Sequence, residues 1–137
     1  MIEDPDFVTA QTDDIVISAC PMLLEEDKAG REFLWGYYMR IENNSGDKIH
    51  LLGKNWNITD ERGNSFCDDS AGFKGEIPEL EPGEYFEFSS MTPVNSPNAV
   101  FYGSCKIMDE RKRVVKEVRI PTFALSARPE PSSAVLN

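Results

Sequence analysis

The sequence has little of what most catalytic and metal centres are built from. It holds one histidine, His50, and three cysteines, Cys20, Cys67 and Cys105, none of them in a CxxC pair. An odd number of widely spaced cysteines favours free thiols in a reducing compartment over a disulfide framework. No spacing of histidine, cysteine or acidic residues matches a zinc site or an EF-hand. We therefore expect no metal, no cofactor and no catalytic residue, and we predict that the chain is not an enzyme.

Long apolar runs and an excess of bases are also missing. No run approaches the ~18 apolar residues of a membrane-spanning helix. The first 14 residues, MIEDPDFVTAQTDD, carry no base and so do not resemble a signal or transit peptide. We expect a cytoplasmic protein without membrane insertion. The formal net charge of −10 disfavours nucleic-acid binding, which depends on bases that neutralise phosphates. The one basic stretch, 106–119, is interpreted as a solvated hairpin.

Alternation with a period of two is the main signal that is present. Phe33, Trp35, Tyr37, Met39 and Ile41 share one parity, as on a strand with one face against a core. No long stretch keeps a helical period free of glycine or proline. Further strands are expected at 15–24, 49–59, 64–68, 85–91, 99–108 and 114–125. Seven short strands without helices predict an all-β fold, an antiparallel β-sandwich.

Turn signals separate these strands. NNSGD at 43–47, DERGN at 60–64 and DERKR at 109–113 each open with Asn or Asp, whose side chain can bond the backbone two residues on. Gly46 and Gly63 can supply the positive φ that such loops often need. The expected domain spans 14–127. It is flanked by an acidic N-terminal tail (1–13) and a flexible C-terminal tail (128–137), each too poor in apolar residues to offset its ordering entropy.

At this point the residues resemble a known family. The segments YYMRIENNSGDKIHLLGKNWNITDERGN, GFKGEIPELEPGEYFEFSSMTPVNSPNAVFYGSCKIMDE and VRIPTFALS look like the ApaG (DUF525) domain, over about residues 14–127. The resemblance implies an immunoglobulin or fibronectin type III-like sandwich of about seven strands. It also implies a small cytosolic bacterial protein, linked genetically to cobalt tolerance and magnesium efflux. Eukaryotic members of the family are thought to bind other proteins, and no enzymatic activity is firmly attached to the domain.

The stretch SAGFKGE at 70–76 needs its own interpretation. Many ApaG members have G-x-G-x-x-G here, with a proposed role in pyrophosphate binding, but this chain has Ser70 at the first position. Two prolines after Gly75 forbid the helix on which a dinucleotide loop depends, and four glutamates at 76–84 would repel an anion. We therefore favour a long connection between sheets, closed by a turn at Pro82–Gly83. The alternative is a backbone nest that holds a phosphate-containing ligand with Ser70, Gly72, Lys74 and Gly75.

Tyrosines provide the second candidate site. Tyr38, Tyr85 and Tyr102 have the parity opposite to that of the buried aromatics, and outward aromatics can form a protein-binding patch. Cross-strand pairing on a solvated sheet is the alternative interpretation. The leading hypothesis is a non-enzymatic module that binds an unidentified protein partner. The runner-up is a phosphate, pyrophosphate or nucleotide sensor that uses the glycine loop. Exposed strand edges would also permit a homodimer by sheet pairing.

Overall fold

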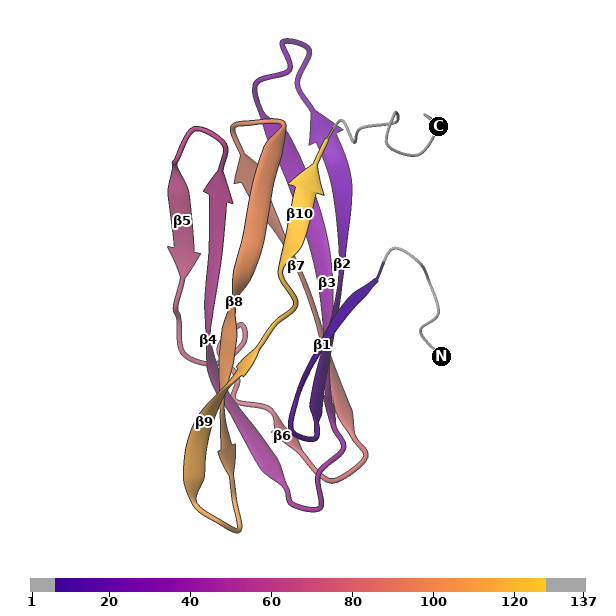
Figure 1. Cartoon of the computed structure of the whole chain (residues 1–137), viewed down its shortest axis with the longest axis vertical. Helices are drawn as coiled ribbons and strands as arrows, with labels where there is room; N and C mark the ends of the chain where they lie inside the picture. The colour runs from indigo at the N-terminus through magenta and orange to yellow at the C-terminus, as the bar shows by residue number, and fades with distance from the viewer. Residues whose placement is uncertain (1–6, 128–137) are drawn as a thin grey trace.

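Two antiparallel sheets lie face to face in the computed structural model, which describes residues 7–127 (Figure 1). The four-stranded sheet has the strand order β1-β2-β3-β7. The six-stranded sheet has the order β10-β8-β4-β5, with β6 paired to β4 and β9 paired to β8. The predicted all-β sandwich is confirmed. No helix within the described range is long and apolar enough to cross a membrane.

The predicted strands are present, with three differences. The structure has β1 (Val8–Thr12), β2 (Ile15–Glu26), β3 (Phe33–Asn43), β4 (Ile49–Asp60), β5 (Ser65–Asp68), β6 (Glu79–Leu80), β7 (Tyr85–Val94), β8 (Asn98–Asp109), β9 (Val114–Arg119) and β10 (Phe123–Ser126). Two short strands, β1 and β6, were not expected from the sequence. The single strand predicted at 114–125 is two strands, β9 and β10, separated by a break that contains Pro121, because proline has no N–H to donate to a ladder.

Part of the expected N-terminal tail is therefore ordered. Val8–Thr12 pairs along Ile15–Ala19 of β2, and Asp13 takes a φ of 53° in the two-residue turn between the strands. Lys116 on β9 donates to the Asp13 carboxylate at 2.8 Å. The tail was predicted from the number of acids in residues 1–13. Residues 8–12 are themselves uncharged, and they pair with the edge of β2. The remaining tail residues, 1–6 and 128–137, lie outside the described range.

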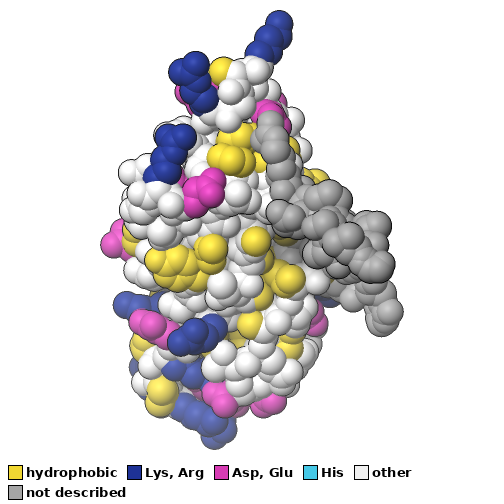
Figure 2. Space-filling model, turned by 45° about the horizontal axis from the view of Figure 1, so that its top comes forward, with side chains coloured by type: hydrophobic (Ala, Val, Ile, Leu, Met, Phe, Trp, Pro, Cys, Tyr) yellow, Lys and Arg dark blue, Asp and Glu magenta, His cyan; other side chains and the backbone are white. Residues whose placement is uncertain are grey.

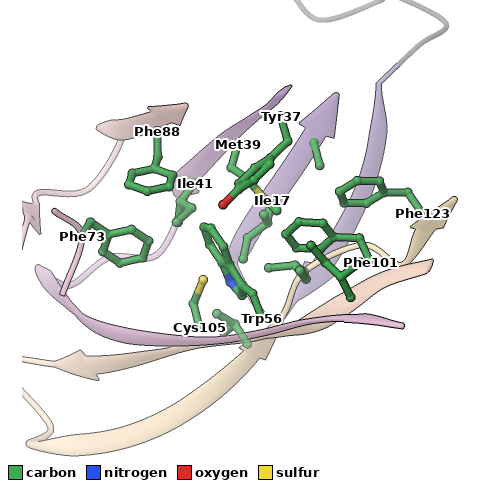
Figure 3. Close-up of a cluster of buried hydrophobic side chains, with 14 of the residues drawn as sticks. Ile17, Tyr37, Met39, Ile41, Trp56, Phe73, Phe88, Phe101, Cys105 and Phe123 are labelled. Atoms are coloured by element: carbon green, nitrogen blue, oxygen red, sulfur yellow. The ribbon is translucent and has the colours of Figure 1, made fainter. Parts of the chain in front are cut away.

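The core forms where the inward faces of the two sheets meet. All five residues of the predicted parity on β3 are buried, from Phe33 to Ile41. From the opposite sheet, Trp56 lies at the centre of the core, with edge-to-face contacts to Tyr37 and Phe88 at centroid distances of 5.8 and 5.5 Å (Figure 3). Such aromatic pairs add about 0.5–1.5 kcal/mol beyond the area they bury.

A β-bulge in β4 changes which side chains face the core. The register with β8 shifts between Leu51 and Gly53. Odd-numbered residues such as Leu51 point inward before the bulge, and even-numbered residues such as Trp56 point inward after it. Lys54 therefore occupies a core-facing position, and it is buried.

In each of the three predicted turns, the side chain of the first residue bonds the backbone of the turn, as predicted. The side-chain oxygens of Asn43, Asp60 and Asp109 accept hydrogen bonds from backbone amides two or three residues on. Gly63 has a φ of +88°, whereas Gly46 is not among the glycines with positive φ. The connection at 69–84 runs from β5 in one sheet to β7 in the other, as predicted, and β6 lies within it.

Candidate functional site

The glycine loop at 70–76 folds into a tight turn that inserts a core residue. Phe73 and Glu76 exchange both backbone hydrogen bonds, at 2.7 and 3.1 Å, across Lys74 and Gly75. Both central residues have positive φ, 51° and 86°, as in the turns that close hairpins. Phe73 is buried and contacts Trp56 and Phe88 in the core (Figure 3). The turn thus places an aromatic ring between the two sheets.

Several polar groups of this loop already have partners within the protein. The amide of Gly72 donates to the Leu52 carbonyl oxygen at 2.7 Å, and Ser70 donates through its amide and hydroxyl to Asp68 Oδ1. The ammonium of Lys74 donates to the Ser89 carbonyl oxygen at 2.8 Å. The four residues proposed for anion binding lie in one short loop, with Lys74 and Gly75 at the centre of its turn. Their contacts favour a structural role for that turn.

His50 and the buried Cys105 do not form a nucleophile–base pair, since the ring nitrogens of His50 face two glutamates. His50 Nε2 lies 2.8 Å from Glu110 Oε1, and Nδ1 lies 3.8 Å from Glu79 Oε2. Burial raises the pKa of the Cys105 thiol to about 12, the opposite of what a nucleophilic cysteine needs. Cys67 is exposed and Cys105 is buried, and neither of these two thiols is in a disulfide. Among residues 7–127, no group of three or more His, Cys, Asp or Glu side chains is placed to hold a metal ion.

The three outward tyrosines lie on two opposite faces. Tyr38 and Tyr85 are on the outer face of the four-stranded sheet, and Tyr102 is on the outer face of the six-stranded sheet. The Tyr38 hydroxyl donates to Glu87 Oε2 at 2.6 Å, and the Arg40 guanidinium lies 3.7 Å from the centroid of the Tyr85 ring. Burial, together with Glu87, raises the pKa of Tyr38 to about 12. The three residues therefore do not form one patch.

An apolar surface that was not predicted from the sequence lies beside Tyr38 on the four-stranded sheet, and we name this surface the methionine patch. It consists of side chains at outward positions of β2, β3 and β7: Met22, Leu24, Leu34, Met91 and Pro93. Met22 and Met91 lie in register on either side of Gly36 and are 52% and 62% exposed.

Glycine and a bulge together shape this patch. The register of β2 on β3 shifts between Leu23 and Glu25, and Leu24 covers Gly36. A Cβ added at Gly36 would lie 3.0 Å from Leu24 Cδ1, so only glycine lets the leucine lie this close to the sheet. Parity could have placed Met22 and Met91 outward once the pairing of the strands was known. The bulge that brings Leu24 beside them has no signal in the sequence.

Comparisons with known proteins agree on one family. The model of the ApaG domain matches residues 24–109. Proteins named ApaG from Rhizobium etli and Agrobacterium fabrum are 36% and 35% identical over 120 residues, which cover 86% of this chain and 92% of each relative. A crystal structure from Bordetella pertussis, described as an ApaA protein, is 26% identical with a TM-score of 0.79. The match covers 85% of this chain and 96% of that one.

Proposed function

This chain belongs to the ApaG domain family, and we propose that it acts there as a non-enzymatic module that binds another protein through the methionine patch. The observation that carries the proposal is the exposure of Met22 and Met91 in one row of the sheet. Exposed apolar side chains that adjoin one another on a sheet are uncommon unless a partner covers them. Methionine suits such a surface because its unbranched, polarizable side chain adapts to different partners.

The surroundings of the patch have the arrangement of a protein interface. An apolar centre with an aromatic residue at its border and a polar rim is typical of such surfaces. Here Tyr38 borders the patch. The polar rim continues along the same outer face past Tyr38 and contains Arg40 and Glu42 on β3 and Glu87 on β7. Arg40 Nε lies 3.6 Å from Glu42 Oε2, and Glu87 accepts from Tyr38, so these rim groups are held in place before a partner arrives. A preorganised rim lowers the ordering cost of association.

A binding role also fits what the family resemblance implies. The genetic link of ApaG proteins to cobalt tolerance and magnesium efflux would then act through the bound partner. Within this proposal the domain supplies a rigid surface, and any chemistry of cation transport belongs to the partner.

Affinity capture with matched variants tests the proposal. The tagged protein would be compared with a double variant, Met22→Ser with Met91→Ser, and with the control Val114→Ser. Val114 is 51% exposed and begins β9, outside the patch. None of the three changes alters net charge. We expect the recovery of a specific partner to fall about tenfold or more with the double variant, because two apolar contacts are lost, and to persist with the control. Equal recovery with all three proteins would contradict the proposal.

A further inference from the structure

A long trough crosses the outer face of the six-stranded sheet, opposite to the methionine patch. It is made of three neighbouring hollows of about 550, 490 and 490 Å³. The first and second share Asn55, Ser104 and Glu117, and the second and third share Tyr102. Its floor follows β4 from Gly53 to Thr59, a length of roughly 20 Å at the rise of a strand. On the face drawn in Figure 2, hydrophobic side chains gather near the middle, with charged side chains of both signs above and below them.

The floor that β4 and β8 form from Asn55 to Thr59 carries no charged side chain at its outward positions. Successive rows across β4 and β8 pair Asn55 with Ser104, Asn57 with Tyr102, and Thr59 with Val100. These residues supply amide and hydroxyl groups together with two apolar side chains. In a protein with a net charge of −10, such a floor fits a neutral ligand that offers many hydrogen-bonding groups.

Charges lie along the β9 side of the trough and at its ends, where opposite signs are close together or already accept hydrogen bonds. On the β9 side, the bases Lys106 and Arg119 lie among the acids Asp69 and Glu117, and Glu117 and Arg119 also line the middle hollow. At one end, Glu61 Oε1 accepts from Ser96 Oγ at 2.8 Å. Beside it, the carboxylate of Asp60 accepts backbone amides of its own turn. These charges therefore leave no strong excess of either sign to attract a charged ligand.

Tyr102 adds an aromatic surface to this floor. It is 39% exposed, and its hydroxyl lies 3.2 Å from Thr59 Oγ1 on the neighbouring strand. This bond holds the ring across the sheet, beside Asn57, whose amide donates to Asn55 Oδ1 at 3.0 Å. A ring fixed along a surface presents its face, and aromatic faces accept the C–H groups of flat, weakly polar molecules.

We propose that this trough binds a neutral oligosaccharide. A sugar chain combines C–H faces that stack on an aromatic ring with hydroxyls that pair with amides and hydroxyls, and the floor offers both in adjacent rows. Its extended shape matches the trough, and its lack of charge matches the middle of the floor. A polyanion would meet the repulsion of a protein with net charge −10. The site is independent of the protein-binding role proposed above, because the two surfaces lie on opposite sheets.

Titration calorimetry with three neutral hexasaccharides, cellohexaose, maltohexaose and N-acetylchitohexaose, tests the proposal on the full chain. We expect saturable binding of at least one of them. Tyr102→Ala should weaken that binding about tenfold, the scale of one lost aromatic contact, and Asn57→Ala should also weaken it. Met22→Ser with Met91→Ser, the matched control on the opposite sheet, should leave it unchanged.

A second readout guards against a variant that fails to fold. In the unsubstituted protein, amide NMR shifts caused by the bound sugar should be concentrated in 53–59 and 100–106. No saturable binding by any of the three sugars would overturn the proposal. Binding with shifts centred on another face would overturn it equally.

Discussion

The ammonium group of Lys54 lies inside the sandwich and donates a hydrogen bond to the carbonyl oxygen of Gly72 at 2.7 Å. Lys54 is 8% exposed, and no ion pair among the described residues includes it. Its nitrogen lies 4.9, 5.6 and 5.8 Å from the ring centroids of Phe73, Phe88 and Trp56. This lysine joins the glycine loop to β4 from within the core.

Replacing Lys54 should therefore destabilise the whole domain. We expect Lys54→Met to lower the free energy of unfolding by about 1–3 kcal/mol, because the buried Gly72 carbonyl loses its charged donor. Urea denaturation monitored by tryptophan fluorescence measures the change. Lys54→Arg is the matched control, since it keeps a charged donor and the contact with the rings, and it should cost less. A Lys54→Met protein as stable as the unsubstituted one would show that the bond contributes nothing.

Two glycines of the same loop should respond very differently to alanine. A Cβ at Gly72 would lie 2.4 Å from the Glu76 carbonyl oxygen, whereas a Cβ at Gly75 would meet nothing within 4 Å. Both have positive φ, so both substitutions cost about 1 kcal/mol of backbone strain. Only Gly72→Ala adds a steric clash with the backbone. Thermal unfolding should place Gly72→Ala well below Gly75→Ala in melting temperature. Equal melting temperatures would show that the loop shifts freely.

These contacts also mark the limit of what the sequence predicts about the loop. The two prolines after Gly75 excluded a helix there, and the structure has none. The insertion of Phe73 could not be predicted, because its ring packs against Trp56 and Phe88, which come from different sheets. The inward position of Lys54 could not be predicted either, because it follows from the bulge in β4. Simple alternation along β4 would have placed it on the solvent side.

The glycine loop should not bind diphosphates. We expect titration with pyrophosphate or ATP to give heats no larger than dilution, because the Gly72 and Phe73 amides and the Lys74 ammonium already donate within the protein. A saturable heat that disappears in Lys74→Ala would contradict this expectation. It would restore the anion site formed by Ser70, Gly72, Lys74 and Gly75.

Asp60 should make the stability of the protein depend on pH in the acid range. Burial acts to raise the pKa of its carboxyl, but hydrogen bonds from Asn64 and Arg62 outweigh burial and the pKa is lowered from 3.8. A lowered pKa means that the stabilisation is complete above about pH 4 and is lost as the pH falls below that value. The difference in melting temperature between the unsubstituted protein and Asp60→Asn should therefore shrink between pH 6 and pH 3. A difference independent of pH would contradict this role.

The candidate surfaces were less predictable than the fold. The alternation of Phe33 to Ile41 was enough to orient β3, because every second residue of a strand with one buried face must be apolar. The same parity placed Tyr38, Tyr85 and Tyr102 on outer faces. It could not tell that they belong to different sheets, since strand order is set by contacts between distant segments. The pairing of Met22, Gly36 and Met91 in one row depends on that order as well.

Site-specific cross-linking is the most direct test of the proposed protein-binding role. A photoreactive amino acid would replace Met91 in the methionine patch and, in a matched protein, Val114 on β9. Both positions are exposed, at 62% and 51%. On irradiation in cells, we expect a cross-linked product of defined mass with a second protein from position 91 and none from position 114. Products from position 114 alone would contradict it.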